Sequence, residues 1–141
     1  MTLYLIARLG DEGVALDTRG VASVVGIERI APVPRVAPHV LGLSALRSRV
    51  LTVIDGRQAV GLGPIDAARA IAVACDVDGH GYALLLDAVD DVVEAGAPEA
   101  CPVALAPAWS RVATGLLRVD GRTVLLLDPA ALVAGPEALA A

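Results

Sequence analysis

The chain has 141 residues, a hydrophobic fraction of 56% and a net charge of −5; this fits one domain, or two very small subdomains sharing a core, and excludes a disordered chain. No apolar run approaches the ~18 residues needed to span a bilayer, and no basic region precedes the first apolar residues as in a signal peptide, so we expect a cytoplasmic protein without direct membrane insertion. The negative charge and an aromatic content of 2% argue against a nucleic-acid partner, because phosphate binding needs basic patches and base stacking needs aromatic side chains.

Three stretches of the chain have the pattern of a β-hairpin, and a further strand lies between the first and the second. Residues 3–17 (LYLIARLGDEGVALD) are two apolar runs around a glycine-containing turn, and residues 49–55 (RVLTVID) are a single apolar run. Residues 70–87 and 113–128 each hold an Asp-Gly pair between apolar runs, a strong hairpin signal because glycine supplies the positive φ of the turn. Many short strands predict an all-β barrel or sandwich. The connections rich in Pro and Gly are residues 30–42, 61–69 and 96–109.

One apolar phrase recurs four times, and each copy ends in aspartate: GVALD, RVLTVID, GYALLLD and RTVLLLD. An Asp at the end of a strand can cap a following helix or turn. Asp128 fits this role best, because Pro129 can take the first position of a short helix and Gly135 follows its end. We expect the other three aspartates to turn the chain out of a sheet in the same way, at Asp17, Asp55 and Asp87.

Few residues are candidates for catalysis. The segment GLSAL, residues 42–46, has the start of a G-x-S-x-G nucleophile motif but lacks the second glycine and the strand–turn–helix context. A Ser44 nucleophile would need His39 or His80 as its base, and a surface or rim position explains both histidines. We therefore predict no catalytic residues and no enzyme, with a small hydrolase using Ser44 as the outside alternative.

Metal and cofactor sites are not indicated either. Cys75 and Cys101 form no C-x-x-C pair and have no ligand spacing with the histidines, so we expect both to be reduced, buried and apolar in behaviour. Asp90, Asp91 and Glu94 could bind a hard cation, but they lack the periodicity of a calcium loop, and a solvated turn explains them. We predict no metal and no cofactor.

Interaction with another protein is the role that is left, and Arg47 and Arg49 are candidates for it. They lie beside an apolar strand, where arginine often anchors an interface: its stem packs on apolar groups and its planar head pairs with a carboxylate. Two solvated charges at a hairpin tip explain the same pattern. The residues alone leave both interpretations open.

The order of the motifs resembles CheW, the adaptor family that couples a chemotaxis histidine kinase to chemoreceptors. LYLIARLGDEGVALDTRGV is similar to the family's opening hairpin. PVPRVAPHVLGLSALRSRVLTVIDGR is similar to its central signature, in which a proline-rich loop leads to V-x-G-x-x-N-L-R-G and then V-x-P-V-I-D-L-R. GYALLLDAVDDVV resembles G-x-L-V-D-x-V-x-E-V, and TGLLRVDGRTVLLLDPAALV resembles the closing strand, turn, strand and short helix. Four motifs in this order are fairly specific, and they cover nearly the whole chain.

The resemblance implies an all-β fold of two small five-stranded β-barrels packed on a shared aliphatic core, with short helical turns. We expect a single CheW-like domain over residues 1–141, with one barrel made of residues 1–56 and 114–141 and the other of residues 57–113. The resemblance also implies a non-enzymatic adaptor. Its expected partners are the regulatory domain of a CheA-type histidine kinase and the tip of a methyl-accepting chemotaxis receptor, in arrays at the inner membrane.

Two groups of functional positions carry over from the family. The loop around Ile30 and Val33 corresponds to the kinase-facing loop, on a weaker transfer. Four residues correspond to the family's receptor and coupling surface. Val21 matches the valine that opens V-x-E-V, and Gly42 matches the glycine of V-x-G. Arg47 matches the arginine of N-L-R-G, and Val50 matches the apolar strand position after it.

Several residues depart from the family motifs. Ala45 and Ser48 replace the Asn and Gly of N-L-R-G, Thr52 replaces the Pro of V-x-P-V-I-D, and Ser23 replaces the Glu of V-x-E-V. Losing the Asn removes a turn cap, and replacing the Gly disfavours a positive φ at that position. Arg49 is an added charge where the family usually has an apolar residue. The alternative function is therefore a divergent paralogue that acts in another kinase pathway, or a competitor that joins arrays without activating the kinase.

Overall fold

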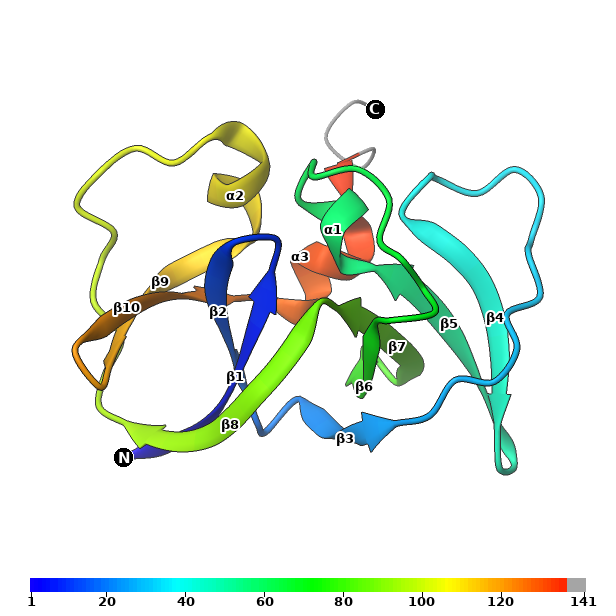
Figure 1. Cartoon of the computed structure of the whole chain (residues 1–141), viewed down its shortest axis with the longest axis horizontal. Helices are drawn as coiled ribbons and strands as arrows, with labels where there is room; N and C mark the ends of the chain where they lie inside the picture. Colours follow the sequence, from blue (N-terminus) through cyan, green and yellow to red (C-terminus); the bar gives the residue numbers. More distant parts are fainter. Residues whose placement is uncertain (137–141) are drawn as a thin grey trace.

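The computed structural model describes residues 1–136, which fold into two small β-barrels lying side by side (Figure 1). This confirms the predicted all-β class with two five-stranded sheets and short helices. No helix in this part of the chain is long and apolar enough to cross a membrane. The elements in chain order are β1 (Thr2–Leu9), β2 (Glu12–Asp17), β3 (Val21–Val25), β4 (Val40–Leu46), β5 (Arg49–Asp55), α1 (Gly56–Ala59), β6 (Ile71–Val77), β7 (His80–Leu86), β8 (Ala88–Ala95), α2 (Pro107–Val112), β9 (Ala113–Val119), β10 (Arg122–Leu127) and α3 (Pro129–Ala134).

The two sheets have the same design. Barrel 1 has the strand order β8-β1-β2-β10-β9, and barrel 2 has the order β3-β6-β7-β5-β4. In each barrel two antiparallel hairpins lie side by side, and one parallel pair of strands joins them. This pair is β2 with β10 in barrel 1 and β7 with β5 in barrel 2. These four paired strands are the four apolar phrases that end in aspartate. The four phrases therefore occupy equivalent places in the two barrels, in which β3 to β7 match β8 to β10 followed by β1 and β2.

The strands are shared between the barrels differently from the sequence-based division. Residues 1–56 with 114–141 do not form one barrel, because β3, β4 and β5 belong to barrel 2 and β8 pairs with β1 in barrel 1. Hairpin signals predict only which consecutive strands pair, whereas the long-range pairs β1–β8 and β5–β7 decide the sheets. The chain crosses between the barrels at residues 18–20 and at Asp87. Residues 137–141 of the expected segment lie outside the described residues.

Each barrel is closed by one isolated bridge between a loop and an edge strand. In barrel 2 the Ala31 N–H donates to the Leu43 carbonyl at 2.8 Å, and the Leu43 N–H donates back at 2.9 Å. In barrel 1 Glu99 and Leu116 exchange two such bonds, both of 2.8 Å. The two bridges occupy equivalent places in the two barrels and satisfy backbone groups at the edges of β4 and β9.

A glycine precedes the bridging leucine in both barrels. A Cβ on Gly42 would overlap the Ala31 carbonyl oxygen and lie 2.8 Å from its carbon and 3.0 Å from the Cα of Pro32. Gly42 also has φ = 145°, which side chains disfavour. A Cβ on Gly115 would lie 3.0 Å from the Glu99 carbonyl oxygen. Glycine is needed here because the closing loop runs directly against the strand backbone.

The core has three parts, which are the interiors of the two barrels and the interface between them. Alternate residues of one strand serve different parts: Ala83 and Leu85 of β7 point into barrel 2, whereas Leu84 and Leu86 join the interface. Strands buried on both faces lack polar alternation. This explains why the repeated phrases are continuous apolar runs, and the shared core is predominantly aliphatic as predicted.

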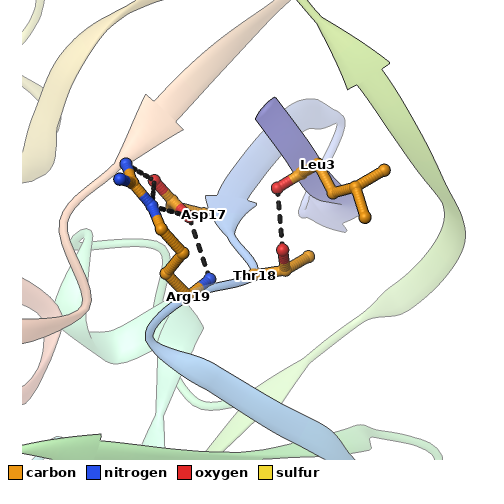
Figure 2. Close-up of polar contacts among 4 residues, drawn as sticks. All are labelled: Leu3, Asp17, Thr18 and Arg19. Carbon is orange, nitrogen blue, oxygen red and sulfur yellow. Dashed lines mark hydrogen bonds and ion pairs between the residues drawn. The ribbon is translucent and has the colours of Figure 1, made fainter. Parts of the chain in front are cut away.

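Asp17 turns the chain out of β2, as the sequence predicts (Figure 2). Its carboxylate accepts a hydrogen bond from the Arg19 backbone N–H at 2.9 Å and forms an ion pair with the Arg19 guanidinium at 2.5 Å. The side-chain hydrogen bond from Arg19 lowers the pKa of Asp17 below its ordinary value. Next to it, the Thr18 hydroxyl donates to the Leu3 carbonyl at 2.9 Å. The first crossing between the barrels is thereby tied to β1.

Asp55 and Asp128 cap the helices that follow them, which confirms the prediction for both. Asp128 accepts a hydrogen bond from the Ala130 N–H at 3.0 Å at the start of α3. Asp55 is fully buried and accepts from the N–H groups of Gln58 at 3.0 Å and Ile65 at 2.9 Å. A buried carboxylate with two backbone donors fixes both α1 and the loop that leads to β6.

Asp87 lies where the chain leaves the sheet of barrel 2, as predicted, but its side chain does not cap a local turn. Its carboxylate accepts from the Gly10 N–H in the β1–β2 turn at 2.6 Å and forms an ion pair with Arg57 of α1 at 3.3 Å. Both partners are far away in sequence, and they belong to different barrels. Asp87 therefore ties the barrels together at the second crossing.

Each barrel donates one side-chain hydrogen bond to a helix that follows a strand of the other barrel. Arg111, in α2 just before β9 of barrel 1, donates to the Ala59 carbonyl at the end of α1 at 2.7 Å. His39, just before β4 of barrel 2, is buried, and its Nε2 donates to the Val133 carbonyl of α3 at 2.7 Å. The three helices lie in the upper half of Figure 1, where α3 contacts both α1 and α2. These contacts fix the relative orientation of the barrels.

Candidate interaction surface

The β4–β5 hairpin presents Arg47 at its tip. Leu46 pairs with Arg49, which leaves Arg47 and Ser48 as a two-residue turn. Arg47 has φ = 58°, in the left-handed region that non-glycine residues seldom adopt. Its side chain is exposed, and no carboxylate of residues 1–136 lies within 4.0 Å of it. Arg47 is thus the residue of the turn with a left-handed backbone. Ser48, at the family's glycine position, does not have a positive φ and so adds no backbone strain.

Arg47 continues an exposed and partly apolar face of the hairpin. Leu43 and Ala45 of β4 point outwards, while the residues between and before them are buried. Val50, which pairs with Ala45 across the ladder, is 63% exposed. An apolar patch beside an exposed arginine is the composition that protein interfaces favour.

Arg49 has a partner within the chain. It forms an ion pair of 2.8 Å with Asp76 of β6, and both side chains are about half exposed. The guanidinium crosses β7 at Gly81, where a Cβ would lie 3.2 Å from Arg49 Cζ and 2.7 Å from Leu51 Cδ2. Arg49 of β5 therefore reaches across β7 to pair with β6. An exposed ion pair of this kind contributes about 0.2–1 kcal/mol to the free energy of unfolding.

Gly42 and Val21 do not lie on the exposed face that Arg47 and Val50 share. Gly42 is buried beneath the closing loop and offers no surface of its own. Val21 is half-buried at the start of β3, pairs with Cys75 of β6 and packs against the shared core. The four predicted coupling residues therefore divide into two on the hairpin surface and two with packing roles.

Ile30 and Val33 lie in the loop between β3 and β4, and both are half-buried. Ile30 packs against the interior of barrel 2. It also lines a groove of about 540 Å³, together with Val24 and Ile27. Contact of this loop with a kinase stays a prediction.

The serine and histidines do not form a catalytic arrangement. Ser44 is 4% exposed in the middle of β4, not on a strand–turn–helix elbow. His39 is buried and bonded to Val133, so the expected rim position is wrong for this residue. His80 is exposed at the start of β7. Within residues 1–136, Ser44 has no hydrogen bond to either histidine.

The acidic residues after Asp87 lie on a strand and not in the predicted turn. Asp90, Asp91 and Glu94 belong to β8, an edge strand of barrel 1, and Asp90 forms an ion pair of 3.5 Å with Arg8. No group of three or more potential ligands in residues 1–136 is arranged to hold a metal ion. Charges on an edge strand discourage pairing with other sheets.

The two cysteines lie in different environments. Cys75 is buried as predicted, and burial raises the pKa of its thiol to about 11. Cys101 is only half-buried, which contradicts the prediction, because it lies in the loop between β8 and α2. Its Sγ lies 3.2 Å from the Val103 carbonyl oxygen, to which it donates a hydrogen bond.

Arg29 is a candidate that sequence patterns did not indicate. It is exposed, and no carboxylate in the described part of the chain lies within 4.0 Å of it. The bridge between Ala31 and Leu43 brings its loop beside β4. The two segments enclose a groove of about 520 Å³, lined by Glu28, Arg29, Ala31, Leu43, Ser44 and Ala45. No local motif could have revealed this, because the groove depends on barrel closure.

Comparison with known proteins agrees with this architecture. The CheW-like domain family matches residues 3–137. The chain is 28% identical over 137 residues to the probable chemotaxis protein CheW of Rhizobium etli, covering 95% of this chain and 88% of that relative. It is 27% identical over 124 residues to the chemotaxis protein CheW of Rhizobium meliloti, covering 86% and 80%. The crystal structure of the scaffolding protein TtCheW from Thermoanaerobacter tengcongensis superposes with a TM-score of 0.80 at 21% identity, covering 90% of this chain and 88% of that chain.

Proposed function

Because this chain belongs to the CheW-like domain family, we propose that it is a non-enzymatic coupling adaptor of a chemotaxis system. It links the regulatory domain of a CheA-type histidine kinase to the tip of a methyl-accepting receptor. It acts in the cytoplasm, in receptor arrays at the inner membrane. The observation that carries the proposal is the family match across both barrels, which extends to two curated chemotaxis relatives.

Features of the hairpin surface support Arg47 as a coupling residue. The arginine is exposed and free of any carboxylate partner in residues 1–136, and it occupies a left-handed conformation that costs roughly 1–2 kcal/mol. Strained residues of this kind cluster at functional sites. The burial of Ser44 meanwhile leaves the hydrolase alternative without an accessible nucleophile.

A pull-down tests the proposed partners directly. The purified chain is immobilised and exposed at low salt to the kinase regulatory domain and, separately, to a receptor-tip fragment. Both are expected to bind. If neither binds, the adaptor function is refuted for this chain.

Variants of Arg47 test the coupling surface. Arg47→Glu is expected to weaken binding to a partner by about tenfold, as for an interface arginine. Folding should be unaffected, because Glu meets the same backbone cost at φ = 58°. Arg122→Glu is the control, since Arg122 is also exposed but lies on β10 of barrel 1.

Arg47→Gly separates stability from coupling. Glycine relieves the left-handed strain, so the free energy of unfolding should rise by about 0.5–1 kcal/mol while partner binding falls. Full binding by both Arg47 variants would show that the arginine is not a coupling residue.

The second candidate is a divergent paralogue that binds the array without activating the kinase, or serves another kinase pathway. It is favoured by Ala45 and Ser48, which flank Arg47 in place of the family's Asn and Gly. Expression in a strain that lacks its own adaptor distinguishes the two functions. An activating adaptor restores chemotaxis, whereas a competitor binds the partners and does not.

A further inference from the structure

The groove beside β4 differs from its counterpart in barrel 1 in how its charges are paired. In barrel 1 Arg118 of β9 forms an ion pair of 3.1 Å with Glu99, the residue of the closing bridge. The equivalent bridge residue of barrel 2 is Ala31, which has no charge. On this side of barrel 2, Arg29 and Arg47 have no carboxylate within 4.0 Å among residues 1–136.

The balance of charge along the chain has the same asymmetry. Residues 18–87, which contain barrel 2, hold seven arginines and six acidic residues. Residues 1–17 with 88–136, which form barrel 1, hold four arginines and nine acidic residues. Barrel 2 is thus the half of an acidic protein that does not repel an acidic partner.

The exposed side chains that β4 contributes to the groove are apolar. Leu43 is 38% exposed, and Ala45 lies beside it on the same face of β4. Ala45 replaces the Asn of the family motif, so this chain offers a methyl group where a polar side chain is usual. Among the described residues, Glu28 is the one acidic residue lining the groove, and Arg29 next to it compensates its charge.

We propose that this groove binds an acidic, aliphatic segment of a protein partner. An aliphatic side chain of that segment packs against Leu43 and Ala45, and its carboxylates pair with Arg29 of the groove and with Arg47 at the hairpin tip beyond it. This inference rests on the proposed function for the identity of the partner, and it adds the chemistry by which the partner is recognised. Arg29 is then a specificity-determining residue that lies outside the family motif.

Peptide binding to the full chain, followed by NMR, tests the inference without a natural partner. The probe is a 12-residue peptide of alternating Leu and Glu, and the matched probe has Gln in place of Glu. The Glu peptide should shift the amide signals of residues 28–31 and 43–50 and bind less tightly as salt is raised. The Gln peptide should bind clearly more weakly.

Variants make the test specific to the two arginines. Arg29→Gln and Arg47→Gln should each lower the affinity for the Glu peptide by about threefold, and the double variant should lower it by about tenfold. Arg122→Gln on barrel 1 is the matched control and should leave binding unchanged. The inference is overturned if both peptides bind equally, if the control weakens binding as much, or if the shifted signals lie elsewhere.

The same variants separate this inference from the proposed function. If the kinase domain and the receptor tip bind but tolerate Arg29→Glu, the adaptor function stands and the groove inference fails. If neither protein binds while the Glu peptide binds with the expected dependence on Arg29, the groove inference stands and the adaptor function fails. Circular dichroism of each variant confirms that the barrels are folded.

Discussion

Replacing Gly42 with alanine should destabilise the protein strongly, because this glycine allows barrel 2 to close. The new methyl group would overlap the Ala31 carbonyl oxygen and approach the Pro32 Cα to 3.0 Å. The loop must then move away from β4 and lose the two hydrogen bonds between Ala31 and Leu43. We therefore expect the Leu43 amide to lose its protection from hydrogen exchange.

The expected magnitude has two parts. Two backbone hydrogen bonds contribute about 1 kcal/mol each, and a side chain at φ = 145° costs about 1–3 kcal/mol. Gly42→Ala should therefore lower the free energy of unfolding by about 3–5 kcal/mol. That is a large fraction of the roughly 5–15 kcal/mol that stabilises a typical domain.

Urea denaturation followed by circular dichroism measures this loss, and two other glycines serve as controls. Gly63 has φ = 82°, and apart from its chain neighbours no atom of residues 1–136 lies within 4 Å of the place a Cβ would take, so Gly63→Ala isolates the backbone cost. Gly96 has open space and no positive φ, so Gly96→Ala should change stability by less than about 0.5 kcal/mol. If Gly42→Ala costs no more than Gly63→Ala, the closing contact is not important for stability and the reasoning is refuted.

Three further outcomes are expected. Arg111→Gln removes the cationic donor to two helix carbonyls, at 2.7 and 3.3 Å, and should cost about 1.5–3 kcal/mol in urea denaturation; an unchanged midpoint would contradict its role between the barrels. Arg19→Gln should raise the pKa of Asp17 towards its ordinary value in an NMR titration. Because the folded-state pKa is lowered, the stabilisation is present above the ordinary pKa and disappears as pH falls through the lowered value, so the variant and the parent should converge in acid. Iodoacetamide at neutral pH should label Cys101 and spare Cys75 in the folded protein, as mass spectrometry would show.

Local structure followed from short stretches of sequence. The predicted Asp-Gly turns are present, with φ of 51° and 80° at Asp78 and Gly79 and of 49° and 76° at Asp120 and Gly121. The helix after Asp128 begins at the predicted proline and ends before a left-handed glycine. These features depend on residues that are adjacent in the chain, so their physical causes are visible in the sequence.

The candidate surface was predictable only in part. The motif comparison pointed to Arg47, and the structure places that arginine on an exposed hairpin tip with Val50 nearby. The family motif could not show that Gly42 is buried, that Arg49 forms an ion pair with Asp76, or that Arg29 shares a groove with β4. Each of these facts depends on segments that are distant in the chain.

The apolar strands, their hairpin turns and the family to which they belong can all be predicted from sequence motifs. Which strands share a barrel depends on the whole fold, because the pairs β1–β8 and β5–β7 join segments that are distant in the chain. Closure of barrel 2 placed Ala31 against Gly42 and opened the groove at Arg29. The pairing of strands is set by the apolar surface that the whole chain buries.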